Sequence, residues 1–160
     1  MIFNKGLSVI GEFIVEKLRN ELEQQGHRNK GTLIDTMRFE IKETNNGYEL
    51  LIIARDYAKY LENAMPSGIW VNVFALAEWV ESKGIATGER EIKNVAFAIR
   101  RTFYNEGRPT KGSLKFSNTG KRDEFITIVM DANAQIIIDK VAKLFDETVN
   151  LGIENAVKNI

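Results

Sequence analysis

Residues 32–66 constrain the fold more than any other part of the chain. Apolar and polar side chains alternate over residues 37–42, which is the period of a half-buried strand. Asn46-Gly47 follows, and these residue types tolerate the positive φ of a tight reversal. The returning run at 48–54 is almost continuously apolar, so it predicts a strand that is buried on both faces or pairs with something this chain does not supply. The segment therefore predicts a β-hairpin at about residues 37–55.

Helical periodicity begins before the hairpin and resumes after it. Residues 7–25 predict a helix, because large apolar side chains recur at spacings of three and four and Gly26 follows as a stop. Residues 32–37 suit either a short helical turn or the lead-in to the first strand. After the hairpin, residues 70–83 predict a second amphipathic helix that Gly84 ends.

Two further helical segments are predicted partly from residues that could cap their N-termini. Asp56 is expected to cap a helical turn at 57–64, and Thr87 to cap a helix that runs to about residue 104. The segment that follows, residues 108–122, is rich in Gly, Pro, Ser and Asn and predicts a loop.

The chain becomes periodic and apolar again from residue 123. Residues 125–130 alone suit a strand equally well, but the stripe continues without a breaker to about residue 150, which favours one long helix. Gly152 is expected to kink or fray it, and residues 151–160 form an apolar tail. Two interpretations of this tail stay open: docking on a partner chain, or packing on the first helix of the same chain.

These elements together predict an α+β fold. We expect a small, mainly antiparallel sheet centred on the hairpin at about 37–55, packed by about four helices and followed by a long C-terminal helix. The chain is expected to be a single domain, residues 1–160, with its core in 7–150 and a helical tail at 151–160. A lone hairpin is marginal in water. A further strand is therefore expected from residues 108–116, from residues 125–130 or from a neighbouring subunit.

Composition excludes several kinds of chemistry. The formal net charge is 0, so no bulk field would hold the whole surface to nucleic acid or membrane. Cysteine is absent, which excludes disulfides, thiolate catalysis and cysteine-bound zinc. His27 is the single histidine and has no carboxylate at ligand spacing, so it is expected to be exposed in a loop, and neither a metal nor a cofactor is expected. No signal peptide and no membrane span are recognised.

One segment is strongly basic. Between Glu89 and Arg122 the chain carries nine Lys or Arg residues against three Glu. Three interpretations stay open: a solvated surface, a contact with acidic patches on a neighbouring subunit, and a contact with DNA phosphates. The candidate residues for a subunit interface or a DNA channel are Arg100, Arg101, Arg108, Lys111 and Lys115.

Aromatic residues gather between the hairpin and the second amphipathic helix. Phe74 and Trp79 are expected to complete the core beneath the hairpin. Tyr57 and Tyr60 are the candidates for an interface, because tyrosine is enriched where proteins meet.

The order of these segments resembles that of a known family. Leu-Ile-Asp-Thr-Met at 33–37, the hairpin, and Asp-Tyr-Ala-Lys-Tyr-Leu-Glu-Asn-Ala at 56–64 look like the central pattern of a tail-component family of tailed bacteriophages. That family includes minor tail, tail-completion and neck (head-tail joining) proteins. The family's tyrosine-alanine-x-tyrosine-leucine/valine-glutamate segment is matched here by Tyr57, Ala58, Tyr60, Leu61 and Glu62.

The resemblance covers roughly residues 7–115 and has two departures. Met65-Pro66-Ser67-Gly68 replaces a shorter break, and Gly31-Thr32 inverts the first pair of a threonine-glycine turn. The long C-terminal helix lies beyond the matched part.

The resemblance implies a structural protein of the virion that performs no chemistry. It would be made in the host cytoplasm and form a homo-oligomeric ring of six or twelve copies at the neck or upper tail. Its partners would be portal, neck or tail components, with possible non-specific contact with packaged DNA and no membrane.

Two other functions are weighed against this one. A DNA-binding module would use the basic segment 90–122 and bind DNA with a steep salt dependence. A small carboxylate-dependent hydrolase would need a pocket with converging carboxylates, and the chain has no nucleophile elbow or phosphate-loop motif to favour an enzyme.

Overall fold

The computed structural model describes residues 2–28, 32–45 and 47–158. The α+β class is confirmed, with a two-stranded antiparallel hairpin, several helices and a long C-terminal helix. The elements in chain order are α1 (Ile2–Gln24), α2 (Thr32–Thr36), β1 (Arg38–Thr44), β2 (Gly47–Ile53), α3 (Ala58–Glu62), α4 (Val73–Ser82), α5 (Glu89–Glu106), the 3-10 helix η1 (Lys111–Phe116) and α6 (Phe125–Lys158).

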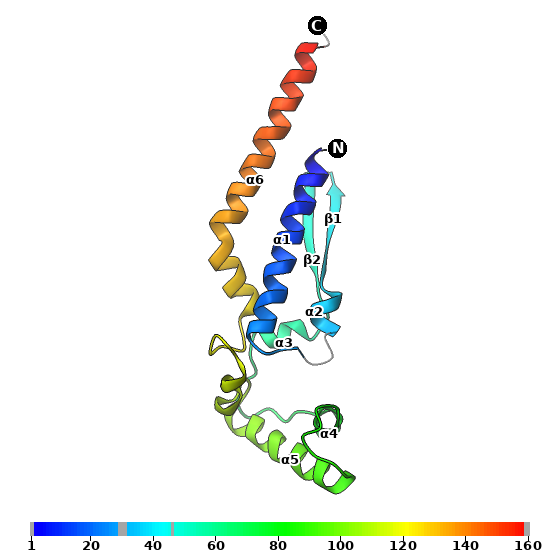
Figure 1. The fold of residues 1–160 in the computed structure, drawn as a ribbon, viewed down its shortest axis with the longest axis vertical. Helices are drawn as coiled ribbons and strands as arrows, with labels where there is room; N and C mark the ends of the chain where they lie inside the picture. Colours follow the sequence, from blue (N-terminus) through cyan, green and yellow to red (C-terminus); the bar gives the residue numbers. More distant parts are fainter. Residues whose placement is uncertain (1, 29–31, 46, 159–160) are drawn as a thin grey trace.

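The molecule is elongated, and its two ends are made by different elements (Figure 1). Helix α1 lies between the hairpin on one side and α6 on the other, and these three form what we call the body. Helices α4 and α5 pack on each other at one end and form what we call the arm, residues 69–107. The last turns of α6 project beyond α1 at the opposite end.

The hairpin forms as predicted, but its second strand is not buried on both faces. The other alternative, that this strand pairs with something outside this chain, stays a prediction. Arg38 pairs with Ile53 and Thr44 with Gly47, so the register is continuous. Leu50 and Ile52 pack against the core, whereas Leu51 points away and is exposed. One face of β2 meets α1 and the other meets solvent, because no described element covers it. Asn46, the first residue of the predicted turn, lies outside the described residues.

The third strand expected from this chain is not formed within the described residues. Segment 125–130 is the start of α6, which settles its ambiguity in favour of helix. Segment 108–116 contributes one bridge, between Arg108 and Met65, and then the 3-10 helix η1. A strand from a neighbouring subunit stays a prediction.

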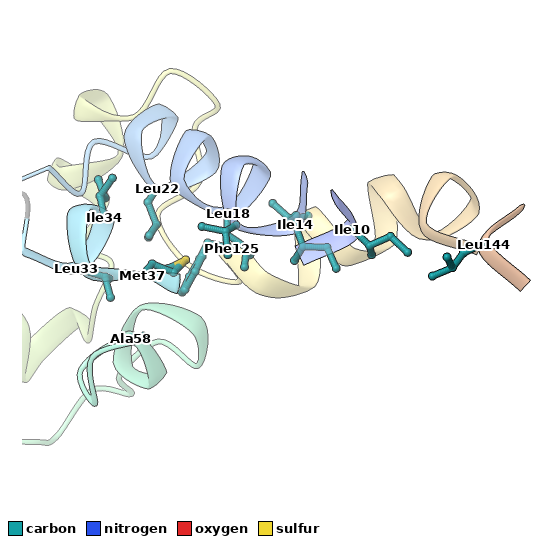
Figure 2. Packing of buried hydrophobic residues seen from close by; sticks show 12 residues of the cluster. Ile10, Ile14, Leu18, Leu22, Leu33, Ile34, Met37, Ala58, Phe125 and Leu144 are labelled. Carbon is teal, nitrogen blue, oxygen red and sulfur yellow. The ribbon is translucent and has the colours of Figure 1, made fainter. Parts of the chain in front are cut away.

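The apolar stripe of α1 forms the centre of the core. Its buried members are Ile10, Ile14, Leu18 and Leu22, which meet residues from α2, α3 and α6 (Figure 2). Two glycines let other elements approach α1 closely. A Cβ on Gly6 would lie 2.2 Å from Leu144 Cδ1, and one on Gly11 would lie 2.5 Å from Phe39 Cγ.

Both predicted helix caps are wrong. Helix α3 has Tyr57 as its N-cap residue with no side-chain cap bond, so Asp56 does not cap it. Helix α5 begins after Gly88 rather than Thr87, and the Thr87 backbone N–H donates instead to Glu91 Oε2 at 3.2 Å. Helix α6 continues unbroken through Gly152.

The N-terminus of α6 is capped by a side chain from a distant segment. The Glu62 carboxylate, at the end of α3, accepts from the backbone N–H groups of Ile126 at 2.7 Å and Thr127 at 3.1 Å. It also accepts from the Thr127 hydroxyl at 2.5 Å. A carboxylate here satisfies free helical N–H groups and lies at the positive end of the helix dipole. Glu62 therefore fixes where the long helix leaves the body.

Replacing Glu62 by glutamine is expected to lower the free energy of unfolding by about 1–2 kcal/mol. The amide keeps the shape but loses the charge that strengthens the cap bonds. The measurement is urea unfolding of wild type and variant, with Glu49→Gln on the exposed hairpin as the matched control. Equal stabilities of the two variants would contradict the role given to Glu62.

Candidate interaction surfaces

The projecting part of α6 carries a row of uncovered apolar side chains. Intrachain burial on α6 ends near Leu144, which packs against Gly6 of α1. Beyond it, Phe145, Val149, Ile153 and Val157 are 54%, 57%, 58% and 66% exposed. Their spacing of four places them in one row along the helix. We call this row, residues 145–157, the tail face.

The tail face answers part of the question that the sequence left open. Phe145 still touches the body, because its ring lies 5.5 Å from the ring of Phe3. Val149, Ile153 and Val157 are more than half exposed, so packing of this apolar row on the first helix, which the sequence allowed, is wrong. Docking on a partner chain stays a prediction.

The arm presents a second surface, built on α5. Phe97 is 54% exposed and is flanked at helical spacing by Lys93 and Arg101, both also exposed. The ring of Trp70, which precedes α4, stacks on the ring of Tyr104 of α5, with their centroids 4.1 Å apart. We call this surface, formed by Trp70, Lys93, Phe97, Arg100, Arg101 and Tyr104, the arm face.

Arg100 belongs to the arm face but is held in place by an aromatic ring. Its guanidinium carbon lies 4.6 Å from the centroid of Trp70, a cation–π distance. Arg101, the next residue along, is exposed. The two adjacent arginines that the sequence singled out therefore differ: Arg100 is part of a stack, and Arg101 projects into solvent.

The other three predicted basic residues lie where the arm joins the body. Arg108 is half-buried, its guanidinium carbon lies 5.6 Å from the Phe103 centroid, and burial lowers its pKa. Lys111 and Lys115 belong to η1 and are exposed. The Lys115 ammonium lies 5.0 Å from the centroid of Phe116. The structure does not gather the five predicted basic residues into one patch: two lie on α5, one in the bridge to Met65 and two on η1.

The expectations for the aromatic residues have mixed outcomes. Phe74 is 73% exposed and Trp79 is 37% exposed, so the prediction that they complete the core is wrong. The physical reason is that α4 packs on α5 in the arm and not beneath the hairpin. Tyr57 and Tyr60 are exposed, and the Lys59 ammonium lies 5.0 Å from the Tyr60 ring. Their interface role stays a prediction.

Phe97 was missed as a candidate site residue although the sequence contained its signal, whereas Val157 lies in the apolar tail for which docking on a partner chain was one interpretation. Phe97 lies midway between Lys93 and Arg101, four residues from each, so it is an apolar residue in an otherwise basic row of the helix. The row that ends in Val157 continues past the last residue that α1 can reach. Neither signal identifies a site until the helices that cover each face are known.

His27 is half-buried, so the expected solvent exposure is wrong. It follows the end of α1, and its Nε2–H donates to the backbone carbonyl of Arg122 at 3.0 Å. Burial, reinforced by the nearby charge of Arg122, lowers its pKa to about 4. His27 and the Arg122 guanidinium, which donates to the carbonyls of Ser113 and Gly26, tie the loop before α6 to the end of α1.

The lowered pKa of His27 predicts a pH-dependent stability. The unfolded chain binds a proton at His27 near pH 6.5, whereas the folded chain binds it only near pH 4. Stability from this group is complete above pH 6.5 and is lost as the pH falls towards 4. The full shift corresponds to about 3 kcal/mol, reduced to about 1–2 kcal/mol because the ring is partly exposed to solvent.

Urea unfolding between pH 4.5 and 7.5 measures this effect. Wild type is expected to lose stability towards the acidic end more steeply than His27→Gln, whose amide keeps a donor for the Arg122 carbonyl. Parallel pH profiles for the two proteins would show that His27 stays protonatable in the folded state.

A groove beside α1, α2 and the start of β1 is lined by four carboxylates and three arginines. Its charged lining residues are Glu12, Glu16, Arg19, Glu23, Arg28, Asp35 and Arg38. Arg28 forms ion pairs with Glu23 and, at 3.6 Å, with Asp35. Arg19 donates to the Met37 carbonyl at 2.5 Å. Two of the four carboxylates, Glu23 and Asp35, are therefore paired with Arg28 inside the groove.

No metal-binding cluster and no membrane-crossing helix are found in the described part of the chain. Nowhere in 2–28, 32–45 and 47–158 do three or more His, Cys, Asp or Glu side chains gather as ligands. None of the described helices has the length and apolar content that a bilayer crossing requires. Comparison with protein-family models, with curated proteins and with solved structures found no match.

Proposed function

We propose that this chain is a structural subunit of a tailed-bacteriophage virion, assembling into a ring of identical copies at the neck or upper tail. The observation that carries the proposal is the uncovered apolar surface at both ends of the molecule, on the tail face and on the arm. Contiguous apolar surface of this kind marks contacts between proteins. The virion location is supported by the resemblance of residues 7–115 to tail, tail-completion and neck proteins.

The body supports the same proposal through the hairpin. Two strands leave backbone donors and acceptors on both outer edges, and such edges are the usual place for a strand of another chain to add. A subunit whose sheet, arm and tail all present contact surface suits an assembly better than an independent monomer. In this role the chain joins portal or neck parts to tail parts around the DNA channel, with no reaction of its own.

A separate DNA-binding module is the weaker candidate, because much of the basic segment is engaged within the chain. Lys93 pairs with Glu89 at 2.6 Å and Lys121 with Glu124 at 2.9 Å. Arg122 donates to backbone carbonyls, and Arg100 stacks on Trp70. The exposed Lys111 and Lys115 of η1 are left for contact with packaged DNA in an assembled ring.

The test is native mass spectrometry of the purified protein combined with electron microscopy. We expect a single closed oligomer with a central channel, and antibody labelling of purified phage particles at the head-tail junction. A protein that stays monomeric at all concentrations would overturn the ring. Labelling confined to a site away from the neck and tail would overturn the location.

A further inference from the structure

We infer that the tail face of one copy docks on the arm face of the next copy, forming a head-to-tail contact that repeats around an assembly. This inference rests on the proposed self-assembly and adds which two surfaces meet. Both surfaces are apolar in the middle: Phe145, Val149 and Ile153 on α6, and Phe97 with Trp70 on the arm.

Charge complementarity identifies the two surfaces as partners. The exposed end of α6, residues 145–158, contains three acidic residues, Asp146, Glu147 and Glu154, and one basic residue, Lys158, at its end. Glu147 also pairs with Lys143 at 3.8 Å, so Asp146 and Glu154 are the acidic groups left for a partner. Residues 92–104 contain Lys93, Arg100 and Arg101 and no acidic residue. The pair between Lys93 and Glu89, one turn earlier on the helix, is exposed to solvent, so it holds Lys93 only weakly. Opposite charges around an apolar centre fix the register of a contact and exclude other partners. Two copies of the tail face, or two of the arm face, would instead bring like charges together.

The spacing of these charges also matches. Asp146 and Glu154 follow Phe145 and Ile153 by one residue, so they form a row along the edge of the tail face eight residues apart. Lys93 and Arg101 are likewise eight residues apart, with Phe97 midway between them. Eight residues of helix span about 12 Å on each side. Each acidic group can therefore lie opposite a basic group, with Asn150 between the two acids and the apolar row of α6 beside this line of charges.

The lengths of the two helical surfaces are compatible. The exposed end of α6 from Phe145 to Lys158 has a length of about 21 Å, and the 18 residues of α5 have a length of about 27 Å. The tail face is therefore short enough to lie along α5 over its whole length.

The position of the two surfaces determines the kind of assembly. They lie at opposite ends of the elongated molecule (Figure 1), so the tail face of a chain does not reach its own arm. A contact between two different surfaces is heterologous, and it generates a ring when the rotation between copies closes.

Charge reversal with cross-complementation tests this contact. Variant one reverses the arm face, Lys93→Glu with Arg101→Glu, and variant two reverses the tail face, Asp146→Lys with Glu154→Lys. Each alone is expected to weaken self-association by at least about 30-fold, because it juxtaposes like charges. An equimolar mixture is expected to assemble again, since the unchanged tail of one variant fits the unchanged arm of the other, and the two reversed surfaces fit each other.

The matched control is Lys5→Glu with Arg55→Glu, which makes the same charge change on exposed residues outside both surfaces. Light scattering over a dilution series measures each protein and the mixture. Restored assembly only in the mixture supports the contact, and misfolded variants would not produce it. Wild-type assembly by the single variants, or no assembly in the mixture, overturns the contact while leaving the ring intact. A monomeric wild type overturns the ring itself.

Discussion

Replacing Phe125 by alanine is expected to lower the free energy of unfolding by about 3–5 kcal/mol. Phe125 is 0% exposed and is the first residue of α6. Its ring lies in the cluster with Leu18, Leu22 and Met37 (Figure 2), where α1 and the end of α2 meet α6. Removing it leaves a cavity that the surrounding side chains can fill only in part, which adds to the lost burial of the ring.

Phe116→Ala is the matched control for this change. Phe116 lies in η1, only nine positions before Phe125, and is 64% exposed, so its loss is expected to cost no more than about 0.5 kcal/mol. Urea unfolding measures both variants. Because self-assembly stabilises the folded chain by mass action, the measurement belongs at a concentration where all proteins have the same oligomeric state. A loss below about 1 kcal/mol for Phe125→Ala would mean that α6 is not anchored where the structure places it.

The parts of the fold that sequence could predict are those with local causes. The stripe of α1 and the hairpin follow from periodicities of a few residues, and α6 follows from a stripe too long for any strand. The caps could not be predicted in this way. Glu62 caps α6 from a position 64 residues away from Ile126, so only the tertiary structure brings the two together.

The sequence did not predict burial correctly where the burial of a residue depends on which helix or loop covers it. An apolar run at 48–54 predicts burial on both faces or pairing with something outside the chain, and within this chain the two-stranded sheet packed on one helix has only one covered face. Phe74 and Trp79 look like core residues, but the arm contains only two packed helices and too little surface to cover them. His27 shows the opposite case, because the loop carrying Arg122 folds over a residue that looks exposed.

The candidate surfaces, like the fold, could be predicted from the sequence only where their causes are local. The sequence alone identified Arg100, Arg101 and the apolar row of α6, because charge and periodicity are local properties. Whether those residues form one surface depends on the separation of arm and body, which no local pattern contains. The uncovered residues therefore become informative only when the fold shows which of them lack an intrachain neighbour.

Aspartate at both Val149 and Ile153 is expected to abolish self-assembly at concentrations where wild type is fully assembled. Burying a Val or Ile side chain contributes about 1.5–3 kcal/mol, so losing both weakens association by about 3–6 kcal/mol, and the new carboxylates add a desolvation cost. Both residues are exposed in the single chain, at 57% and 58%. The folded monomer should therefore keep its helical circular dichroism spectrum and lose only its oligomers.

Asn150→Asp separates the effect of burial from the effect of charge. It places the same carboxylate next to Val149 but beside the apolar row, in the row of Asp146 and Glu154 that we infer to meet Lys93 and Arg101. Assembly by this variant should equal or exceed that of wild type, and its dissociation should become more sensitive to salt. Sedimentation velocity of the three proteins over a dilution series distinguishes the cases. If the double variant assembles as wild type does, the apolar row of α6 is not an interface between copies. If Asn150→Asp fails to assemble, charge alone governs this surface, and the apolar contact does not hold the copies together.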